Sequence, residues 1–189
     1  YFCSVGNPLP AFPDLRNFPN MMYLELMGTK IDSIPNNIAF LQRLKIFKFS
    51  STDDTLKLTK NFKFMRSLNT LILESVILDS CPRPPFRIEN LKILSLKNCN
   101  LQAIPENLEK MQKLESLNLD NNKLTALPRG IYKMTSLTVL SLAGNKITKI
   151  PDTICHLQKL TILDLRGNTI SEENREEIKA LIPGIKILY

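Results

Sequence analysis

The chain has 189 residues, of which 43% are hydrophobic and 23% charged, and these proportions exclude a disordered or collagen-like protein. Its four cysteines are too few for a disulfide scaffold, and no apolar run approaches the roughly 20 residues that span a membrane. Lysine and arginine outnumber acidic residues by 25 to 18, a net charge of +7. A basic balance suggests nucleic acid or a membrane surface as partner, but only the placement of the charges can decide this.

A repeated segment of 23 residues organises most of the chain. From Leu91 the sequence reads LKILSLKNCNLQAIPENLEKMQK, and the lines beginning at Leu114 and Leu137 repeat its pattern. The same register gives seven repeats over residues 21–170, one of them 24 residues long, with starts at 21, 44, 68, 91, 114, 137 and 160. Repetition at this period predicts a solenoid whose neighbouring units share a core.

The pattern resembles the leucine-rich repeat family in its 23-residue class, LxxLxLxxNxLxxLPxxIxxLxx, over about residues 9 to 189. The resemblance implies an α/β solenoid of horseshoe shape. Its parallel β-sheet would line the concave side, extended and 3₁₀ segments the convex side, and a helix would cap the carboxyl end. The repeats look most like those of bacterial proteins that are often secreted or exposed at the cell surface. The cytoplasm is the alternative, because intracellular scaffold proteins share this repeat class.

Residues 1–20 precede the first full repeat and predict either an amino-terminal cap or a degenerate partial repeat. Leu15 and Phe18 fall where a preceding repeat would place its returning apolar residues. In the same phase, Tyr1 and Cys3 would take its inward strand positions. A partial repeat would make the chain the final portion of a longer protein. No linker interrupts the sequence, so we expect a single domain.

Each repeat is expected to begin with a short strand. Its two leucines, as in Leu94 and Leu96, are two residues apart and point to the same side of the strand. Truncating such a buried leucine to alanine should cost about 2–5 kcal/mol. The residues between the leucines point outward.

The chain should turn out of the sheet three residues after the second leucine. The last three repeats carry Asn122, Asn145 and Asn168 there, whose amides can pair with backbone groups of neighbouring turns. The earlier repeats carry other residues, so we expect a less regular ladder in that half: Thr29, Thr52, Val76 and Cys99.

The returning half of a repeat contains an Ile-Pro or Leu-Pro step, which favours an extended or short 3₁₀ segment. Repeat two lacks this proline and is predicted to be more helical. In repeat three, the PRPP segment at residues 82–85 is predicted to exclude a helix. Residues 171–189 are predicted to form the cap, with Ser171 as the helix N-cap and Ile185, Ile187 and Leu188 in a closing strand.

The sequence carries no catalytic or phosphate-binding motif, and we predict neither an enzyme nor a cofactor. His156 stands beside Cys155, but adjacent residues on such a segment diverge rather than converge, so a surface histidine is favoured. The cysteines lack the spacing of a metal site, and their disulfide pairing stays open; Cys81 and Cys99 are predicted to be buried thiols.

The outward strand residues form a predicted binding surface, since solenoids offer extended concave faces to partners. The sequence therefore predicts a non-catalytic module that recognises an unidentified protein, of the host or of the same organism. For any single residue, the alternative is that a β-branched side chain merely suits a strand. The apolar anchors would be Tyr23, Met27, Ile46 and Ile72. The charged specificity residues would be Glu25, Lys48, Glu74, Lys97, Asp120, Asp164 and Arg166.

A second hypothesis is adhesion to an anionic polysaccharide or glycosaminoglycan through repeat two. Its basic residues recur every three positions and would share one edge of a turn: Lys57, Lys60, Lys63 and Arg66. The alternative is a solvated convex face. Much of the positive charge lies in this repeat, whereas acidic residues slightly outnumber basic ones on the charged concave rows. That distribution, without interleaved aromatic residues, argues against nucleic acid, and nothing suggests membrane insertion.

Overall fold

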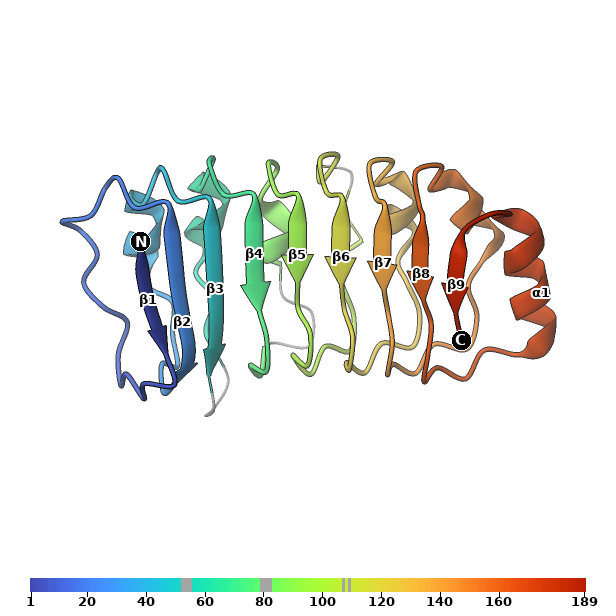
Figure 1. Cartoon of the computed structure of the whole chain (residues 1–189), viewed down its shortest axis with the longest axis horizontal. Coiled ribbons are helices and arrows are strands. Elements are labelled where there is room, and N and C mark those ends of the chain that lie inside the picture. Colours follow the sequence, from blue (N-terminus) through green and yellow to red (C-terminus); the bar gives the residue numbers. More distant parts are fainter. Residues whose placement is uncertain (52–55, 79–82, 107, 109) are drawn as a thin grey trace.

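The structure is a computed structural model of the whole chain and describes residues 1–51, 56–78, 83–106, 108 and 110–189. Within these residues, nine strands form one parallel sheet in chain order (Figure 1). The predicted solenoid of repeats is therefore confirmed. The strands are β1 (Phe2–Val5), β2 (Tyr23–Thr29), β3 (Ile46–Ser51), β4 (Thr70–Leu73), β5 (Ile93–Ser95), β6 (Ser116–Asn118), β7 (Val139–Ser141), β8 (Ile162–Asp164) and β9 (Lys186–Leu188).

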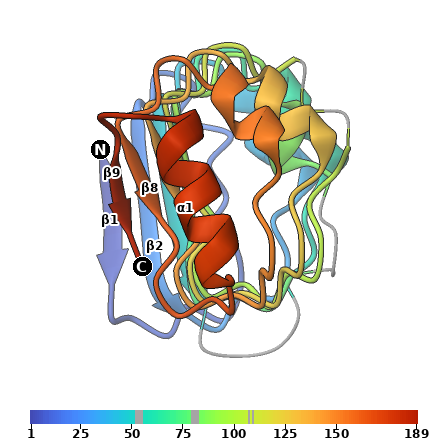
Figure 2. The ribbon, with the colours of Figure 1, turned by 90° about the vertical axis from the view of Figure 1, so that its right-hand side faces the viewer.

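The core lies between this sheet and a row of short 3₁₀ turns. Seen along the solenoid from its carboxyl end, the turns lie across the core from the strands, toward the strands' amino ends (Figure 2). Inward leucines such as Leu94 and Leu117 pair in register and are fully buried, as the spacing predicts. The described turns are η1 (Asn36–Phe40), η2 (Lys60–Phe64), η3 (Pro85–Arg87), η4 (Arg129–Lys133) and η5 (Asp152–His156).

The proline steps produce the predicted return segments. Pro35, Pro128 and Pro151 are extended residues that immediately precede η1, η4 and η5. Repeat two is not more helical, contrary to the prediction, because η2 is a five-residue 3₁₀ turn like these three. Its cap is Thr59, whose hydroxyl accepts a hydrogen bond from the Asn61 N–H at 3.1 Å.

The prediction that PRPP excludes a helix is wrong at its last residue. The 3₁₀ turn η3 starts at Pro85, after Pro84 in the right-handed helical region. Proline is tolerated in the first turn of a helix because an N–H there has no partner within the helix to lose. Only Pro84 and Pro85 bear on this point, since residue 82 lies outside the described residues.

The strand register at the amino end differs from the prediction by one residue. Phe2 pairs with Leu24 and Ser4 with Leu26, so these two residues, and not Tyr1 and Cys3, take the inward positions. The offset between β1 and β2 is 22 rather than 23 residues, and a shift of one residue exchanges the two faces of a strand. Leu15 is buried as expected, whereas Phe18 is 53% exposed.

The asparagines after the strands form the predicted ladder. Asn145 accepts a hydrogen bond from the Leu124 N–H at 3.1 Å and donates to the carbonyls of Leu119 and Leu142 at 2.9 and 2.8 Å. In the amino-terminal half the register shifts between Leu26 and Thr29, an irregularity of the kind expected there. The predictions for Thr52 and Cys81 fall outside the described residues.

Cys99 takes the place of the asparagine in its repeat. Its thiol is fully buried, as predicted, and donates to the Leu73 carbonyl at 3.1 Å. Asn122 donates to the equivalent carbonyl, that of Leu96, one repeat later. Burial raises the pKa of the Cys99 thiol to about 12. The thiol is therefore a neutral hydrogen-bond donor within the ladder.

Helix α1 (Glu172–Leu181) and strand β9 cover the carboxyl end of the core. The Ser171 hydroxyl caps the helix by accepting the Asn174 N–H at 3.2 Å, and Ile178 is fully buried beneath it. Among the described residues, no helix has the length and apolar character needed to cross a membrane.

Candidate interaction surfaces

The outward side chains of β1–β9 and of the two residues after each strand are here named the outer sheet face, and they include every residue that the sequence proposes for a concave binding surface. The parallel register aligns them in rows, so that Glu25 lies beside Lys48 and Ser141 beside Asp164. All are at least partly exposed except Asp164, which is buried. The structure thus brings the predicted residues onto one continuous surface, but they differ in how free their polar groups are.

A polar and aromatic cluster occupies the β1–β3 end of this face. The Tyr23 hydroxyl donates to the Glu25 carboxylate, and the Lys48 ammonium lies 3.8 Å from Glu25 and 5.4 Å from the centre of the Tyr23 ring. Tyr1 adds a second ring, 5.5 Å from that of Tyr23. Hydrogen bonding to Tyr23 and the charge of Glu25 raise the pKa of Lys48. These contacts hold Lys48 over the strand rather than in free solvent.

Acidic residues of the face bind neighbouring repeats instead of standing free. Glu74 accepts a hydrogen bond from the Ser95 hydroxyl at 2.7 Å. Asp120 accepts from the Ser141 hydroxyl at 2.7 Å and from the Ala143 N–H at 2.9 Å. Their carboxylates therefore help to fix the spacing of β4–β7.

Asp164 and Arg166 form an ion pair at the β8 end, with 2.6 Å between Asp164 Oδ2 and an Arg166 nitrogen. The aspartate side chain is 8% exposed and that of the arginine 62%. The hydrogen bonds from Arg166 lower the pKa of Asp164. Asp164 thus positions the guanidinium, and Arg166 is the member of the pair that a partner can reach.

Apolar side chains supply the other part of the outer sheet face. Met27, Ile46 and Ile72 are half-buried, while Ile93 is 41% exposed. Ile93 was not among the predicted site residues, although it stands in the same row as Ile46 with only Thr70 between them. Its position in the repeat was the available signal, but β-branched residues are common in strands and the row alone did not distinguish it.

The loops after the strands carry a feature that the sequence analysis missed. The residue before the asparagine position has a positive φ in most repeats, and Asn98, Asn121 and Gly144 are examples at 57°, 55° and 66°. Asparagine and glycine favour this left-handed conformation, so the recurring Asn or Gly was a readable signal.

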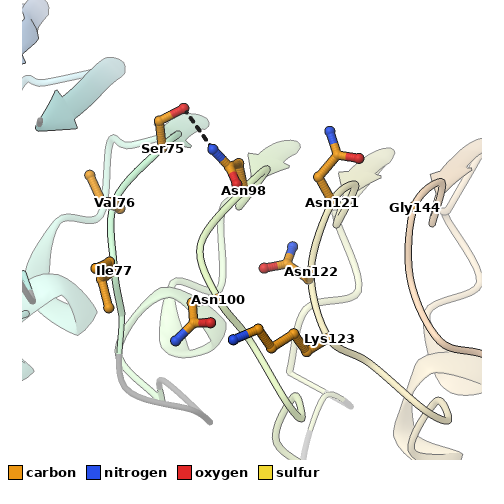
Figure 3. A pocket seen from close by; sticks show the side chains of 9 residues that line it. All are labelled: Ser75, Val76, Ile77, Asn98, Asn100, Asn121, Asn122, Lys123 and Gly144. Atoms are coloured by element: carbon orange, nitrogen blue, oxygen red, sulfur yellow. Dashed lines mark hydrogen bonds between the residues drawn. The ribbon is translucent and has the colours of Figure 1, made fainter.

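These loops line a hollow of about 490 Å³ at the carboxyl ends of β4–β7 (Figure 3). Asn98 donates to the Ser75 hydroxyl at 3.3 Å across it, and Lys123 extends toward Asn100. Ile77, 48% exposed, forms its apolar border. The hollow is open and largely amide-lined.

Two further hollows lie on the opposite side of the molecule, over the 3₁₀ turns. One, of about 620 Å³, has Phe40, Asn61 and Phe64 in its lining, and the other, of about 760 Å³, is bordered by η2, η3 and the return of the fourth repeat. The two hollows share Phe64 and Arg66, and together they are named the return groove.

Two of the four basic residues proposed from repeat two line this groove, and the other two lie outside it. All four are exposed, and Lys63 and Arg66 line it. Lys57 instead lies on an extended return segment, bridged to Ser33, and Lys60 begins η2; neither lines either hollow. The sequence analysis missed Arg87 and Lys110, which do line it and which occupy the position of Phe64 in the two following repeats.

The histidine and the cysteines are the side chains that the sequence analysis weighed for catalysis or metal binding. His156 and Cys155 are both exposed, at the end of η5. No group of three or more histidine, cysteine or acidic side chains is placed to hold a metal ion within the described ranges. Cys3, Cys99 and Cys155 are free thiols.

Comparisons with known proteins agree with this architecture. The family model described as leucine rich repeat matches residues 89–147 and, in an overlapping match, residues 112–170. The comparison with curated proteins found no match.

Three solved structures show the same fold. A leucine-rich repeat protein of Leptospira interrogans is 25% identical with a TM-score of 0.57, the alignment covering 93% of this chain and 56% of that one. The ectodomain of the receptor kinase GASSHO1/SCHENGEN3 from Arabidopsis thaliana is 24% identical (TM-score 0.73; 92% and 21% covered). The leucine-rich repeat domain of the type III effector XopL is 20% identical (TM-score 0.70; 98% and 74% covered).

The chain spans about half the length of the Leptospira protein and about a fifth of the plant ectodomain. The likeness therefore concerns the repeat fold rather than any whole protein. With the family match, the single parallel sheet and the asparagine ladder taken together, residues 89–170 match the leucine-rich repeat family and the described chain has the fold of that family.

Proposed function

We propose that the protein is a non-catalytic recognition module that binds a partner protein on its outer sheet face. The observation that carries this proposal is that exposed apolar and charged side chains, among them Ile93, Lys97 and Arg166, lie together on the outer sheet face. Nine strands at about 4.8 Å spacing give a face roughly 40 Å wide. That width is sufficient for a standard interface of about 800 Å² per partner.

Two further considerations support a protein partner. Leucine-rich repeat folds generally serve as interaction modules rather than as enzymes. The plant receptor ectodomain was solved in complex with another protein, CASPARIAN STRIP INTEGRITY FACTOR 2, so a related fold is seen with a bound partner. The apolar residues Ile46, Ile72 and Ile93 would be the anchors of such an interface, and exposed charges would select the partner.

The test is affinity capture from host and self lysates with matched variants. The face variant combines Ile93→Asp with Lys97→Glu. The control combines Lys146→Glu with Lys149→Glu, two exposed lysines outside the outer sheet face. The face variant should capture at least about tenfold less of a partner that the wild-type protein binds, and the control should capture it as the wild-type protein does. Both variants should keep the wild-type melting temperature. Equal retention by both variants would show that the partner binds elsewhere.

We further propose that the protein acts outside the cell or at its surface, with the cytoplasm as the alternative. Support comes from the low cysteine content, the regular repeats and the likeness to a Leptospira repeat protein, which also favours a bacterial source. Fractionation of the producing cell, followed by immunodetection, tests this location. Confinement to the soluble cytoplasm would contradict it.

A second candidate function is adhesion to an anionic polysaccharide or glycosaminoglycan. One observation favours it: all four basic side chains proposed from repeat two are exposed on the side away from the outer sheet face. Retention on immobilised heparin at physiological ionic strength tests this function directly. A chain that elutes without retention does not have it.

A further inference from the structure

We propose that the return groove is a binding site for a sulfated, uronic-acid-containing polysaccharide, with Arg66 and Arg87 as its main anion-binding groups. This inference rests on the second candidate function and identifies where on the molecule the sugar chain would bind. It changes the residues involved, since two of the four lysines and arginines first proposed lie outside the groove and two new ones lie inside it.

The groove extends along the solenoid rather than across a single repeat. Its two hollows, of about 620 and 760 Å³, share Phe64 and Arg66 and therefore adjoin each other over consecutive return segments. A groove with this direction suits a linear polymer, whose successive units can contact successive repeats.

The lining of the larger hollow is strongly basic. Among the described residues that line it, Lys63, Arg66, Arg87 and Lys110 are accompanied by one carboxylate, that of Glu89. Within the described residues, the only ion pair made by these side chains joins Lys110 to Glu89, at 3.8 Å and with both side chains mostly exposed. An exposed pair of this kind is weak. The arginine guanidinium groups are free to bind sulfate or carboxylate groups, which they can contact through two parallel N–H groups.

The uncharged lining favours a sugar over a simple polyanion. Phe40 and Phe64 are 63% and 48% exposed on neighbouring turns, and an exposed ring can pack against the apolar face of a sugar ring. The amides of Asn61 and Asn90 lie in the same groove and offer donors and acceptors for hydroxyl groups.

The same lining argues against single-stranded nucleic acid. Such sites stack successive bases on a series of aromatic side chains. Here the series ends at Phe64, because η3 ends at Arg87 and the next repeat carries Lys110 at the aligned position. The Lys63 ammonium also lies 4.9 Å from the centre of the Phe64 ring and covers one approach to it.

The decisive experiment measures the affinity of the full chain for a heparin hexasaccharide by isothermal titration calorimetry. The groove variant is Arg66→Ala with Arg87→Ala. The control is Lys57→Ala with Lys60→Ala, which removes the same charge from exposed positions outside the groove. We expect the groove variant to lose about tenfold or more in affinity and the control about twofold or less, consistent with two lost charge-assisted contacts. Phe64→Ala should weaken binding by a smaller factor at an unchanged melting temperature.

Three other results would contradict the groove, the polysaccharide function or both. Equal losses in the groove and control variants would mean that heparin responds to net charge, which excludes the groove but leaves polysaccharide adhesion standing. No binding by the wild-type chain would exclude both. A thymidine dodecamer serves as the comparison ligand. If it binds more tightly than the hexasaccharide and depends on the same arginines, the groove is a nucleic-acid site and the proposal is wrong.

Discussion

The amide of Asn145 illustrates how single residues hold the repeats together. We expect Asn145→Ala to lower the free energy of unfolding by about 2–3 kcal/mol, because the Leu124 N–H and two carbonyls lose a buried partner. Urea denaturation measures the loss. Asn168→Ala is the matched control: its amide makes equivalent bonds but is half-buried, so water can replace it at lower cost. Equal losses would contradict a role for burial.

Cys99 gives a prediction about pH at the same scale. Its pKa is raised to about 12 in the folded chain, whereas an unfolded thiol titrates near 8.5. The unfolded state therefore releases its proton first. The stability that Cys99 contributes should be complete below about pH 8.5 and should fall as the pH rises toward 12. Urea denaturation of the wild-type chain and of Cys99→Val across this range measures the difference, and parallel curves for the two proteins would contradict the prediction.

Reactivity provides an independent check on the same thiol. At pH 8, iodoacetamide should modify Cys3 and Cys155, which are exposed, and leave Cys99 unmodified until the chain unfolds. Peptide mapping by mass spectrometry distinguishes the three sites. Rapid modification of native Cys99 would mean that its turn opens far more readily than its full burial indicates.

The sequence predicted individual residues well where the repeat supplied many copies of the same position. Leu94, Leu117 and Asn145 could be assigned because each stands in a column whose role follows from strand geometry or amide chemistry. Asp164 could not, since its burial depends on how Arg166 folds back over it. The groove residues Arg87 and Lys110 were in register, but only the packed turns show that they line a hollow.

At the scale of an element, turn η4 depends on a close approach that only glycine allows. A Cβ at Gly130 would lie 2.0 Å from the backbone oxygen of Glu106 in the preceding return segment. Gly130→Ala should therefore push η4 away and cost about 1–3 kcal/mol, as overpacking of a core does. Thr153→Ala, at the aligned position of η5, removes atoms and should have a smaller effect. Thermal unfolding of both variants decides between them, and a neutral Gly130→Ala would refute this packing.

Turns and strands were predicted correctly where the conformation of a single residue type determines them. The predictions were wrong where packing or pairing with a neighbouring repeat determines the structure. The Pro35 and Pro151 steps set their return segments through proline itself. In repeat two, the Thr59 cap and the packing of buried Phe62 give the same 3₁₀ turn without proline. The register of β1 is set by pairing with β2, which the residues of β1 do not reveal.

For the whole molecule, a solenoid predicts that damage spreads only to nearby repeats. Ile178→Ala removes a fully buried side chain under the cap, a change that costs about 2–5 kcal/mol. Because each repeat contacts its neighbours alone, hydrogen exchange should accelerate in α1, β8 and β9 and stay unchanged in β2–β4. Leu117 in β6 is buried to the same degree, and Leu117→Ala should instead accelerate hydrogen exchange in β6 and in the neighbouring strands β5 and β7. Uniform acceleration by both variants would mean that the chain unfolds as one cooperative unit, and the nearest-neighbour description would then fail.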